Sequence, residues 1–234
     1  MPCAPPVLRY GLYSLRGNNM PNWCHNKIII KDKSKKIYDL YRKVCNHNRL
    51  NFNKIIPMPL DLQLTKAGST SDIGYDAYYG NYKPLLEYSW IKSENITTKE
   101  QLCEFLDKSD PEYKKQGTIY KNNIDKYGYK NWYDWACANW GTKWNACYQT
   151  VLRKGRLLII DFDTAWAAPI PILFALSKLT NSTVVLQFGG IEAVCEGEIH
   201  FKNGEIVKEN IIDHDEEWYN KMFGNIENDT IAQN

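Results

Sequence analysis

The sequence predicts an α+β fold in which one sheet packs against two helices. Three observations support this class. Short β-branched runs bounded by turn residues predict strands. Two segments with apolar residues at helical spacing, around residues 34–46 and 169–179, predict core helices. Asn203-Gly204, between two strand-like runs, is the strongest hairpin signal in the chain.

The first strand and the first helix come early in the chain. Residues 27–30 include three consecutive isoleucines, and this β-branched run predicts a strand. Ser34 then caps a helix that continues to about residue 46. Ile37 and Leu40 share one face of that helix, so we expect the face to be buried.

The remaining elements follow from about residue 146 onward. We expect two strands joined at Lys154-Gly155, then a helix, a further strand and a terminal hairpin; their ranges are 146–152, 157–162, 169–179, 183–188, 197–201 and 205–208. The complete order is β-α-(insertion)-β-β-α-β with a C-terminal hairpin. A split β-α-β order of this kind is the ferredoxin-like arrangement.

A long insertion, at about residues 60–140, separates the first helix from the second strand. Gly, Ser, Asp and Tyr gather within residues 68–82, which predicts an irregular surface or binding loop. Thr98 and Gln101 form a capping-box pattern that predicts a helix start. A second helix is predicted from about Trp132 to a stop at Gly141. The insertion should therefore be helical and rich in loops.

The two ends of the chain are predicted to lie outside the domain. Residues 1–19 contain three prolines and no apolar period, so we expect an unstructured leader, with either Met1 or Met20 as the start. One ferredoxin-like domain is expected over residues 20–214. An acidic tail that frays is expected over residues 215–234.

The composition is that of an ordinary globular protein. Lys and Arg total 29 against 27 Asp and Glu, and a net charge of +2 does not by itself indicate a polyanion partner. The seven cysteines are irregularly spaced and contain no CxxC pair, which indicates reduced thiols. No stretch reaches the ~18 apolar residues of a membrane helix. We therefore expect a cytoplasmic protein with no membrane partner.

Three segments carry a resemblance to a known family. They read MPNWCHN at residues 20–26, NWGTKWN at 139–145 and FDTAWAAPIP at 162–171. Together they resemble the YubB-like ferredoxin-like proteins of phages and plasmids, although Ala168 stands where that family often has proline. The resemblance implies an accessory role of a mobile element inside a bacterial host cell. It implies no catalytic residue.

Tryptophans and small polar residues gather in these three segments. Buried polar groups need partners, so core filling alone does not explain so many amides and hydroxyls. Two interpretations stay open: tryptophans that pack the insertion onto the sheet, or a pocket in which rings stack on a base while polar groups bind its edges. The candidate ligand-binding residues are Asn22, Trp23, Asn26, Trp140, Thr142, Lys143, Trp144, Asn145, Thr164 and Trp166.

Catalytic and metal-binding patterns are weak. Cys24, His25 and Asp163 include the groups of a nucleophilic site, but adjacent strand residues point to opposite faces. Asp161 and Asp163 share a strand face, and we interpret them as ending a strand and capping the next helix. The Cys and His pairs lack the spacing of four zinc ligands. We expect no catalytic residue, no metal and no cofactor.

These observations favour a binding protein over an enzyme. Our leading hypothesis is a non-enzymatic phage or plasmid protein, acting in counter-defence, that captures a nucleotide-like small molecule or a host protein. A single-stranded nucleic-acid-binding module is the first alternative, because ferredoxin-like sheets also stack bases in RNA-recognition domains. A hydrolase with an unrecognised site is the second. Formation of an oligomer is compatible with the sequence.

Overall fold

The computed structural model describes residues 22–190, 195–213 and 215–223. The leader predicted over residues 1–19 lies outside them, as does Met20. The chain divides into two compact units, the first made of Met1–Pro57 with Ala136–Asn234 and the second of Met58–Trp135.

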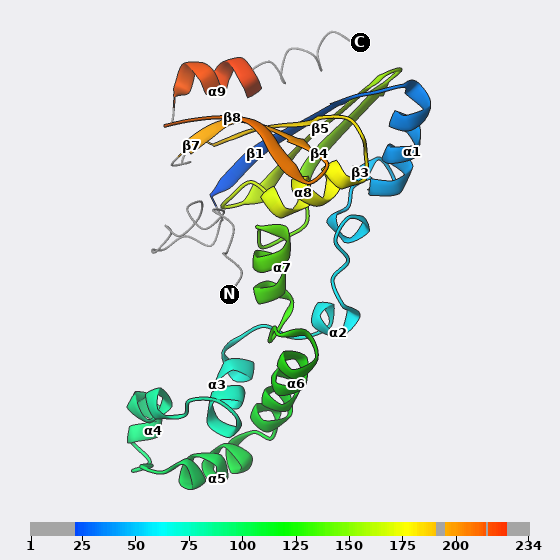
Figure 1. The fold of residues 1–234 in the computed structure, drawn as a ribbon. Helices are drawn as coiled ribbons and strands as arrows, with labels where there is room; N and C mark the ends of the chain where they lie inside the picture. The colour runs from blue at the N-terminus through cyan, green and yellow to red at the C-terminus, as the bar shows by residue number, and fades with distance from the viewer. Residues whose placement is uncertain (1–21, 191–194, 214, 224–234) are drawn as a thin grey trace, which may run out of the picture. The chain divides into compact units, whose positions relative to one another are not determined.

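A six-stranded antiparallel sheet forms the centre of the first unit (Figure 1). Its strand order is β4-β5-β1-β6-β7-β8, so β1, the first strand in sequence, lies inside the sheet between β5 and β6. The bounds are β1 (Trp23–Lys31), β4 (Cys147–Lys154), β5 (Leu157–Ala165), β6 (Val184–Gly189), β7 (Cys195–Lys202) and β8 (Glu205–Asp213). A short pair, β2 (Cys45–Asn46) and β3 (Arg49–Leu50), precedes the 3-10 turn η2 (Phe52–Lys54).

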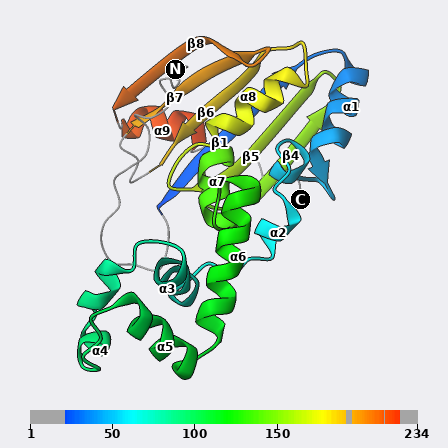
Figure 2. The same ribbon diagram turned by 60° about the horizontal axis from the view of Figure 1, so that its bottom comes forward.

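One face of the sheet is the hydrophobic core. Alternate residues of β1, among them Ile28 and Ile30, are buried on this face, as a period of two requires. Helices α1 (Ser34–Val44) and α8 (Ile170–Lys178) cover it (Figure 2). An edge-to-face contact of Phe174 with Phe201, at 5.2 Å between ring centroids, joins α8 to β7. The predicted α+β class is confirmed.

The opposite face carries a helix where the sequence predicts a fraying tail. Helix α9 (Glu216–Phe223) lies across this face (Figure 1), where the Lys27 ammonium donates to the Met222 carbonyl at 2.6 Å. The expectation of a fraying tail is wrong for these residues. The Asp215 carboxylate accepts the backbone N–H of Glu217 and caps the helix, and Phe223 is buried. Residues 224–234 lie outside the described ranges.

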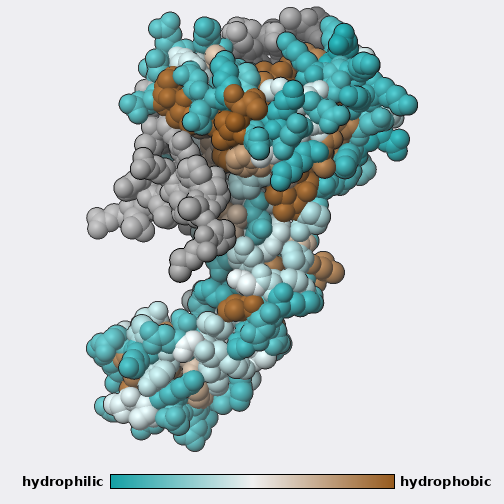
Figure 3. Space-filling model, viewed as in Figure 1, coloured by the Kyte–Doolittle hydropathy of each residue, from teal (hydrophilic) through white to brown (hydrophobic). Residues whose placement is uncertain are grey.

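The second unit is helical. Its elements are α2 (Leu60–Gln63), α3 (Ser69–Tyr78), η3 (Lys83–Glu87), α4 (Ser89–Lys92), α5 (Lys99–Ser109) and α6 (Glu112–Tyr127). The capping box of Thr98 and Gln101 is confirmed at the start of α5. The loop predicted over residues 68–82 is wrong, because α3 occupies most of it. On the side seen in Figure 3, the surface of this unit is mostly hydrophilic with small apolar spots.

Two glycines explain how a helix forms in that polar segment. Gly74 of α3 faces Gly117 of α6, and a Cβ on Gly74 would lie 1.9 Å from the Tyr113 carbonyl oxygen. The absence of side chains lets the two helix backbones touch. Packing of α3 on α6 therefore overrides the low helix propensity of the segment.

Helix α7 (Trp132–Trp140) spans the boundary between the units in sequence. It ends, as predicted, before Gly141, whose φ of 78° is the left-handed conformation that favours glycine. Within the described ranges, no helix is both long and apolar enough to cross a membrane.

Candidate functional site

An aromatic–lysine cluster lies at one end of the sheet, within the first unit. It consists of Trp23, Lys143, Trp144, Tyr148 and Trp166. Trp23 begins β1 and pairs with Ala165, the last residue of β5, so the chain leaves the sheet at Trp166 beside it. The Trp166 N–H donates to the Asn22 carbonyl at 2.8 Å, which fixes these two chain segments together.

The side chains of the cluster contact one another closely. The Trp23 ring lies 6.2 Å from the Trp144 ring and 5.2 Å from the Tyr148 ring, edge-to-face with the latter. The Lys143 ammonium lies 4.4 Å from the Trp144 ring centroid and 5.3 Å from that of Trp166. These are cation–π distances to two indoles at once. Residues from three separate parts of the sequence thus form one surface.

Two rings of the cluster are exposed and have left-handed backbones. Trp166 is 44% exposed with φ of 72°, and Tyr148 is 76% exposed with φ of 45°. Tyr148 lies at the irregularity in β4 between Cys147 and Thr150, where the strand register shifts. For bulky residues this backbone region is a true outlier, and such outliers cluster at functional sites.

Beneath the cluster, buried polar groups hold the strand ends in place. The Asn26 amide donates to the Thr164 hydroxyl at 2.8 Å, and that hydroxyl donates to the Ala167 carbonyl at 2.7 Å. The Thr142 hydroxyl donates to the Ala165 carbonyl at 3.0 Å. These three side chains are each at most 2% exposed, so they position the loops around Trp166 and Lys143.

Asn145 and Trp140 make contacts on the inner side of the same loop. The side-chain oxygen Oδ1 of Asn145 accepts the Phe52 N–H at 2.9 Å, and its side-chain amide donates to Asn51 Oδ1 at 2.9 Å. Trp140 is 4% exposed, and its indole N–H donates to the Ile56 carbonyl at 2.9 Å. Its ring meets Phe52 edge-to-face, so Trp140 is a core residue away from the exposed rings.

The ten candidate residues therefore divide into two groups. Trp23, Lys143, Trp144 and Trp166 form the surface, with the exposed Asn22 beside them. Asn26, Trp140, Thr142, Asn145 and Thr164 form the support below. Sequence reasoning missed Tyr148, since nothing in its flanking residues marks a register shift in the strand.

A row of ionisable side chains crosses the second sheet face next to the cluster. His25 Nδ1 lies 2.6 Å from Asp163 Oδ1, while Cys24 is buried on the core face, as strand alternation predicts. On the other side of Asp163 its strand partner is Cys147. Burial and the Asp163 carboxylate raise the pKa of the Cys147 thiol. A nucleophilic thiol needs the reverse, with an imidazole beside the sulfur and a lowered pKa.

Lys27 and Asp161 form the neighbouring pair, with 3.7 Å between ammonium and carboxylate. Burial raises the pKa of Asp161, and the nearby ammonium partly offsets that effect. The interpretation that Asp161 and Asp163 end a strand and cap the next helix is wrong. Strand β5 continues to Ala165, and both aspartates pair with residues of β1.

The described residues contain no set of donors for a metal ion. Across the residues that the structure describes, no three side chains of His, Cys, Asp or Glu come close enough together to hold a metal ion. No disulfide joins any of the described cysteines whose side chains are placed.

The C-terminal part of the chain is similar to a known domain family. Residues 139–230 match the family model described as "Ferredoxin-like domain in Api92-like protein". This segment includes β4, β5, α8 and the cluster residues Lys143, Trp144, Tyr148 and Trp166. The match supports a ferredoxin-like domain over residues 139–230, in agreement with the predicted α+β class.

A solved structure is similar as well. The crystal structure of the protein api92 from Yersinia pseudotuberculosis has 13% sequence identity and a TM-score of 0.45, over 84% of this chain and 99% of that chain. No curated protein matches this chain.

Proposed function

We propose that this is a non-enzymatic binding protein that captures a nucleotide-like ligand by stacking its base on the aromatic–lysine cluster. The observation that carries the proposal is the presentation of Trp166 and Tyr148. Both rings are exposed, and both have left-handed backbones. Stacking on a base needs an accessible π surface, and these two rings offer one.

Exposed rings in left-handed conformations stabilise the fold little. Each such conformation costs roughly 1–3 kcal/mol for a residue other than glycine. Trp166 is 44% exposed, so its burial offsets only part of that cost. A residue at this position that served packing alone would have a side chain better suited to the left-handed region, such as asparagine. A ligand that covers the ring supplies the missing burial.

Lys143 fits the same role. Its ammonium lies over two indoles and is held there by cation–π attraction, worth roughly 0.5–1 kcal/mol at exposed sites. The flexible stem of a lysine can extend to an anionic group near a stacked base. A nucleotide presents both a planar ring and a phosphate, and so matches both parts of the cluster.

The biological setting of this proposal rests on the three sequence segments. Their resemblance to YubB-like proteins supports a phage or plasmid protein that acts in the cytoplasm of a bacterial host. Counter-defence by sequestering a nucleotide signal is the role that fits a binder without a catalytic site. A host protein that inserts an aromatic or cationic side chain between the rings would use the same chemistry.

Single-stranded nucleic acid is the second candidate ligand. It is favoured by the openness of the cluster, because Tyr148 is 76% exposed and a continuous strand could pass over it. Stacking on open rings tolerates any base sequence. The central strands offer no such platform, since their second face carries the pairs His25–Asp163 and Lys27–Asp161.

Fluorescence titration tests the proposal. We expect nucleoside mono-, di- or triphosphates to quench tryptophan emission, and Trp166→Ala to weaken binding by about tenfold or more, since stacking is worth roughly 1–3 kcal/mol per base. Lys143→Ala should weaken the binding of nucleotides but leave the binding of nucleosides unchanged. Trp90→Ala is the matched control, because Trp90 is 38% exposed and lies in the second unit.

Equal binding by native protein, Trp166→Ala and Tyr148→Ala would overturn the proposal. Binding of an oligonucleotide with no binding of free nucleotides would select the second candidate. In both cases melting temperatures of the variants show whether the fold is intact.

A further inference from the structure

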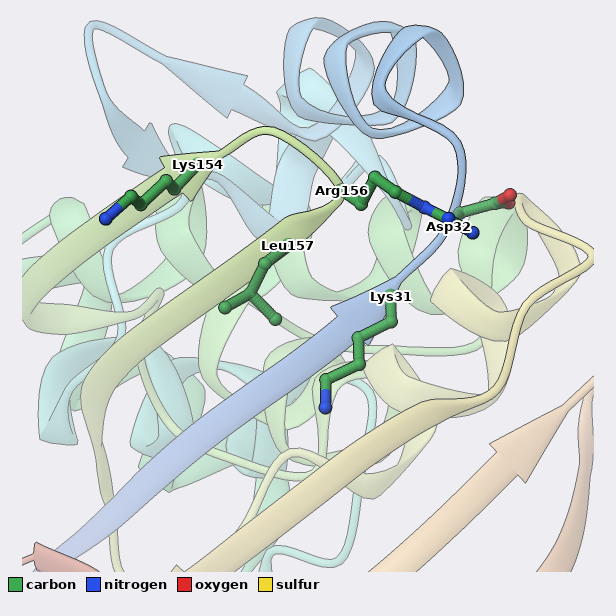
Figure 4. Close-up of a pocket in the computed structure, with 5 residues that line it drawn as sticks. All are labelled: Lys31, Asp32, Lys154, Arg156 and Leu157. Atoms are coloured by element: carbon green, nitrogen blue, oxygen red, sulfur yellow. The ribbon is translucent and has the colours of Figure 1, made fainter.

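A shallow hollow lies at the end of the sheet away from the aromatic–lysine cluster. Its volume is about 350 Å³, and it is lined by Lys31, Asp32, Lys154, Arg156 and Leu157 (Figure 4). Lys31 is the last residue of β1, and Trp23 of the cluster is the first. Eight residue steps of a strand place the two ends about 26 Å apart. A single nucleotide cannot span that distance, so the hollow is a separate site.

Strand register places two of the cations side by side. Leu157 of β5 pairs with Lys31 of β1 on one side and with Lys154 of β4 on the other. Directly paired residues project to the same sheet face. The two lysines therefore flank Leu157, with Cα atoms about 10 Å apart, which is twice the strand spacing. Figure 4 shows Leu157 between them and Arg156 in the adjoining hairpin turn.

The charge of this hollow is not balanced. Its one acid, Asp32, accepts a hydrogen bond from the Ser182 hydroxyl at 2.6 Å and pairs with Lys36 at 3.7 Å. Among the described residues, no carboxylate forms an ion pair with Lys31, Lys154 or Arg156. By contrast, Lys27 on the same face of β1 is paired with Asp161. The hollow is thus lined by three cations without an ion pair and by one acid that already has partners, while the chain as a whole has a net charge of only +2.

From this arrangement we propose that the hollow binds a compact phosphate anion, of the size of pyrophosphate. Two lysines supply mobile point charges, and an arginine supplies a planar fork that fits phosphate oxygens. Leu157 lies between the two lysines and forms an apolar part of the lining. A long polynucleotide fits less well, because that partner calls for an extended basic stripe. This site is independent of the base-stacking function proposed above.

The three cations also repel one another when no anion is bound. Their removal should therefore leave the free protein as stable as before, or slightly more stable. An anion that binds only the folded state raises its stability in proportion to the logarithm of ligand concentration. These two effects distinguish a ligand site from lysines that are simply exposed to solvent.

Thermal melts and calorimetry with inorganic pyrophosphate, at constant ionic strength, test the proposal. We expect pyrophosphate to raise the melting temperature of the full chain, and the triple variant Lys31→Gln, Lys154→Gln, Arg156→Gln to abolish this rise and weaken binding by about tenfold or more. The control variant changes three exposed lysines of the second unit, Lys83, Lys108 and Lys115, to glutamine and removes the same charge.

Equal stabilisation of the native chain, the triple variant and the control by pyrophosphate would overturn the site. So would binding of a single-stranded oligonucleotide that the triple variant weakens while pyrophosphate does not compete. If the triple variant does not fold, the single variant Arg156→Gln, in an exposed turn, is measured in its place and should also reduce the stabilisation by pyrophosphate. Trp166→Ala should leave pyrophosphate binding unchanged, so each proposal can fail without the other.

Discussion

Trp140 ends α7 and Trp166 directly follows β5, and both come from motifs of similar composition, yet the two side chains have opposite environments. Trp140 is 4% exposed and has its indole N–H bonded to a backbone carbonyl. Trp166 is 44% exposed and has a left-handed backbone. Neighbouring Asn and Thr residues therefore do not distinguish a core tryptophan from an exposed one. Backbone conformation and exposure distinguish the two kinds of tryptophan.

Of the substitutions that test this contrast, Trp140→Ala should have the largest effect. Trp140→Ala should lower the free energy of unfolding by roughly 3–5 kcal/mol, because it removes a buried ring and leaves a cavity beside Phe52. Urea unfolding followed by circular dichroism measures it. A loss below 1 kcal/mol would mean that Trp140 is not a core residue.

Next in size is the support beneath the exposed rings. Thr164→Val keeps the side-chain shape but removes the hydroxyl that Asn26 donates to and that donates to Ala167. We expect a loss of about 1–3 kcal/mol, since a buried amide donor loses one partner. Thr150→Val on the exposed side of β4 is the control. Equal unfolding midpoints for both variants would contradict the supporting role.

Trp166 should behave in the opposite way. Trp166→Asn places a residue that tolerates the left-handed region at φ of 72°, so we expect stability within about 1 kcal/mol of native, with ligand binding lost. Melting curves and the fluorescence titration are measured on the same samples. A large destabilisation would make Trp166 a packing residue like Trp140.

The smallest effect concerns pH and Asp161. Because burial raises the pKa of Asp161 in the folded state, its ionised form costs stability at neutral pH, and that cost disappears as pH falls through the raised pKa. Asp161→Asn should therefore be relatively most stable, compared with native, at neutral pH. Its advantage should shrink toward acid pH. Unfolding free energies measured from pH 7 to pH 3 would show a constant difference if this is wrong.

Much of the fold follows from local patterns in the sequence. The isoleucine run of β1, the spacing of Ile37 and Leu40, and the turn at Asn203-Gly204 each have a short-range cause, and the three elements form. The prediction is wrong in detail, because β1 already begins at Trp23 and the helix follows Lys33 without a side-chain cap from Ser34. Helix α3 does not follow from local pattern, because it depends on the contact of Gly74 with α6, a partner about forty residues away. Helix α9 likewise depends on the sheet face that Phe223 meets.

The candidate site was only partly accessible from sequence. The tryptophan motifs indicate one shared neighbourhood, and Trp23, Trp144 and Trp166 do lie together. Which of these residues face solvent depends on strand alternation, and the exposure of Tyr148 coincides with the register shift in β4. A shift of this kind comes from the pairing of two strands, and neither strand encodes it alone.

The touching backbones of α3 and α6 have a consequence for what the second unit can tolerate. Even a methyl group at Gly74 would overlap a carbonyl, and a Cβ at Gly117 would lie 2.4 Å from the Gly74 backbone. A library of all twenty residues at these two positions, selected for folded protein, should return glycine at both. Elsewhere on the two helices the exposed positions should accept most residues, so this crossing is the point at which the unit is least able to change.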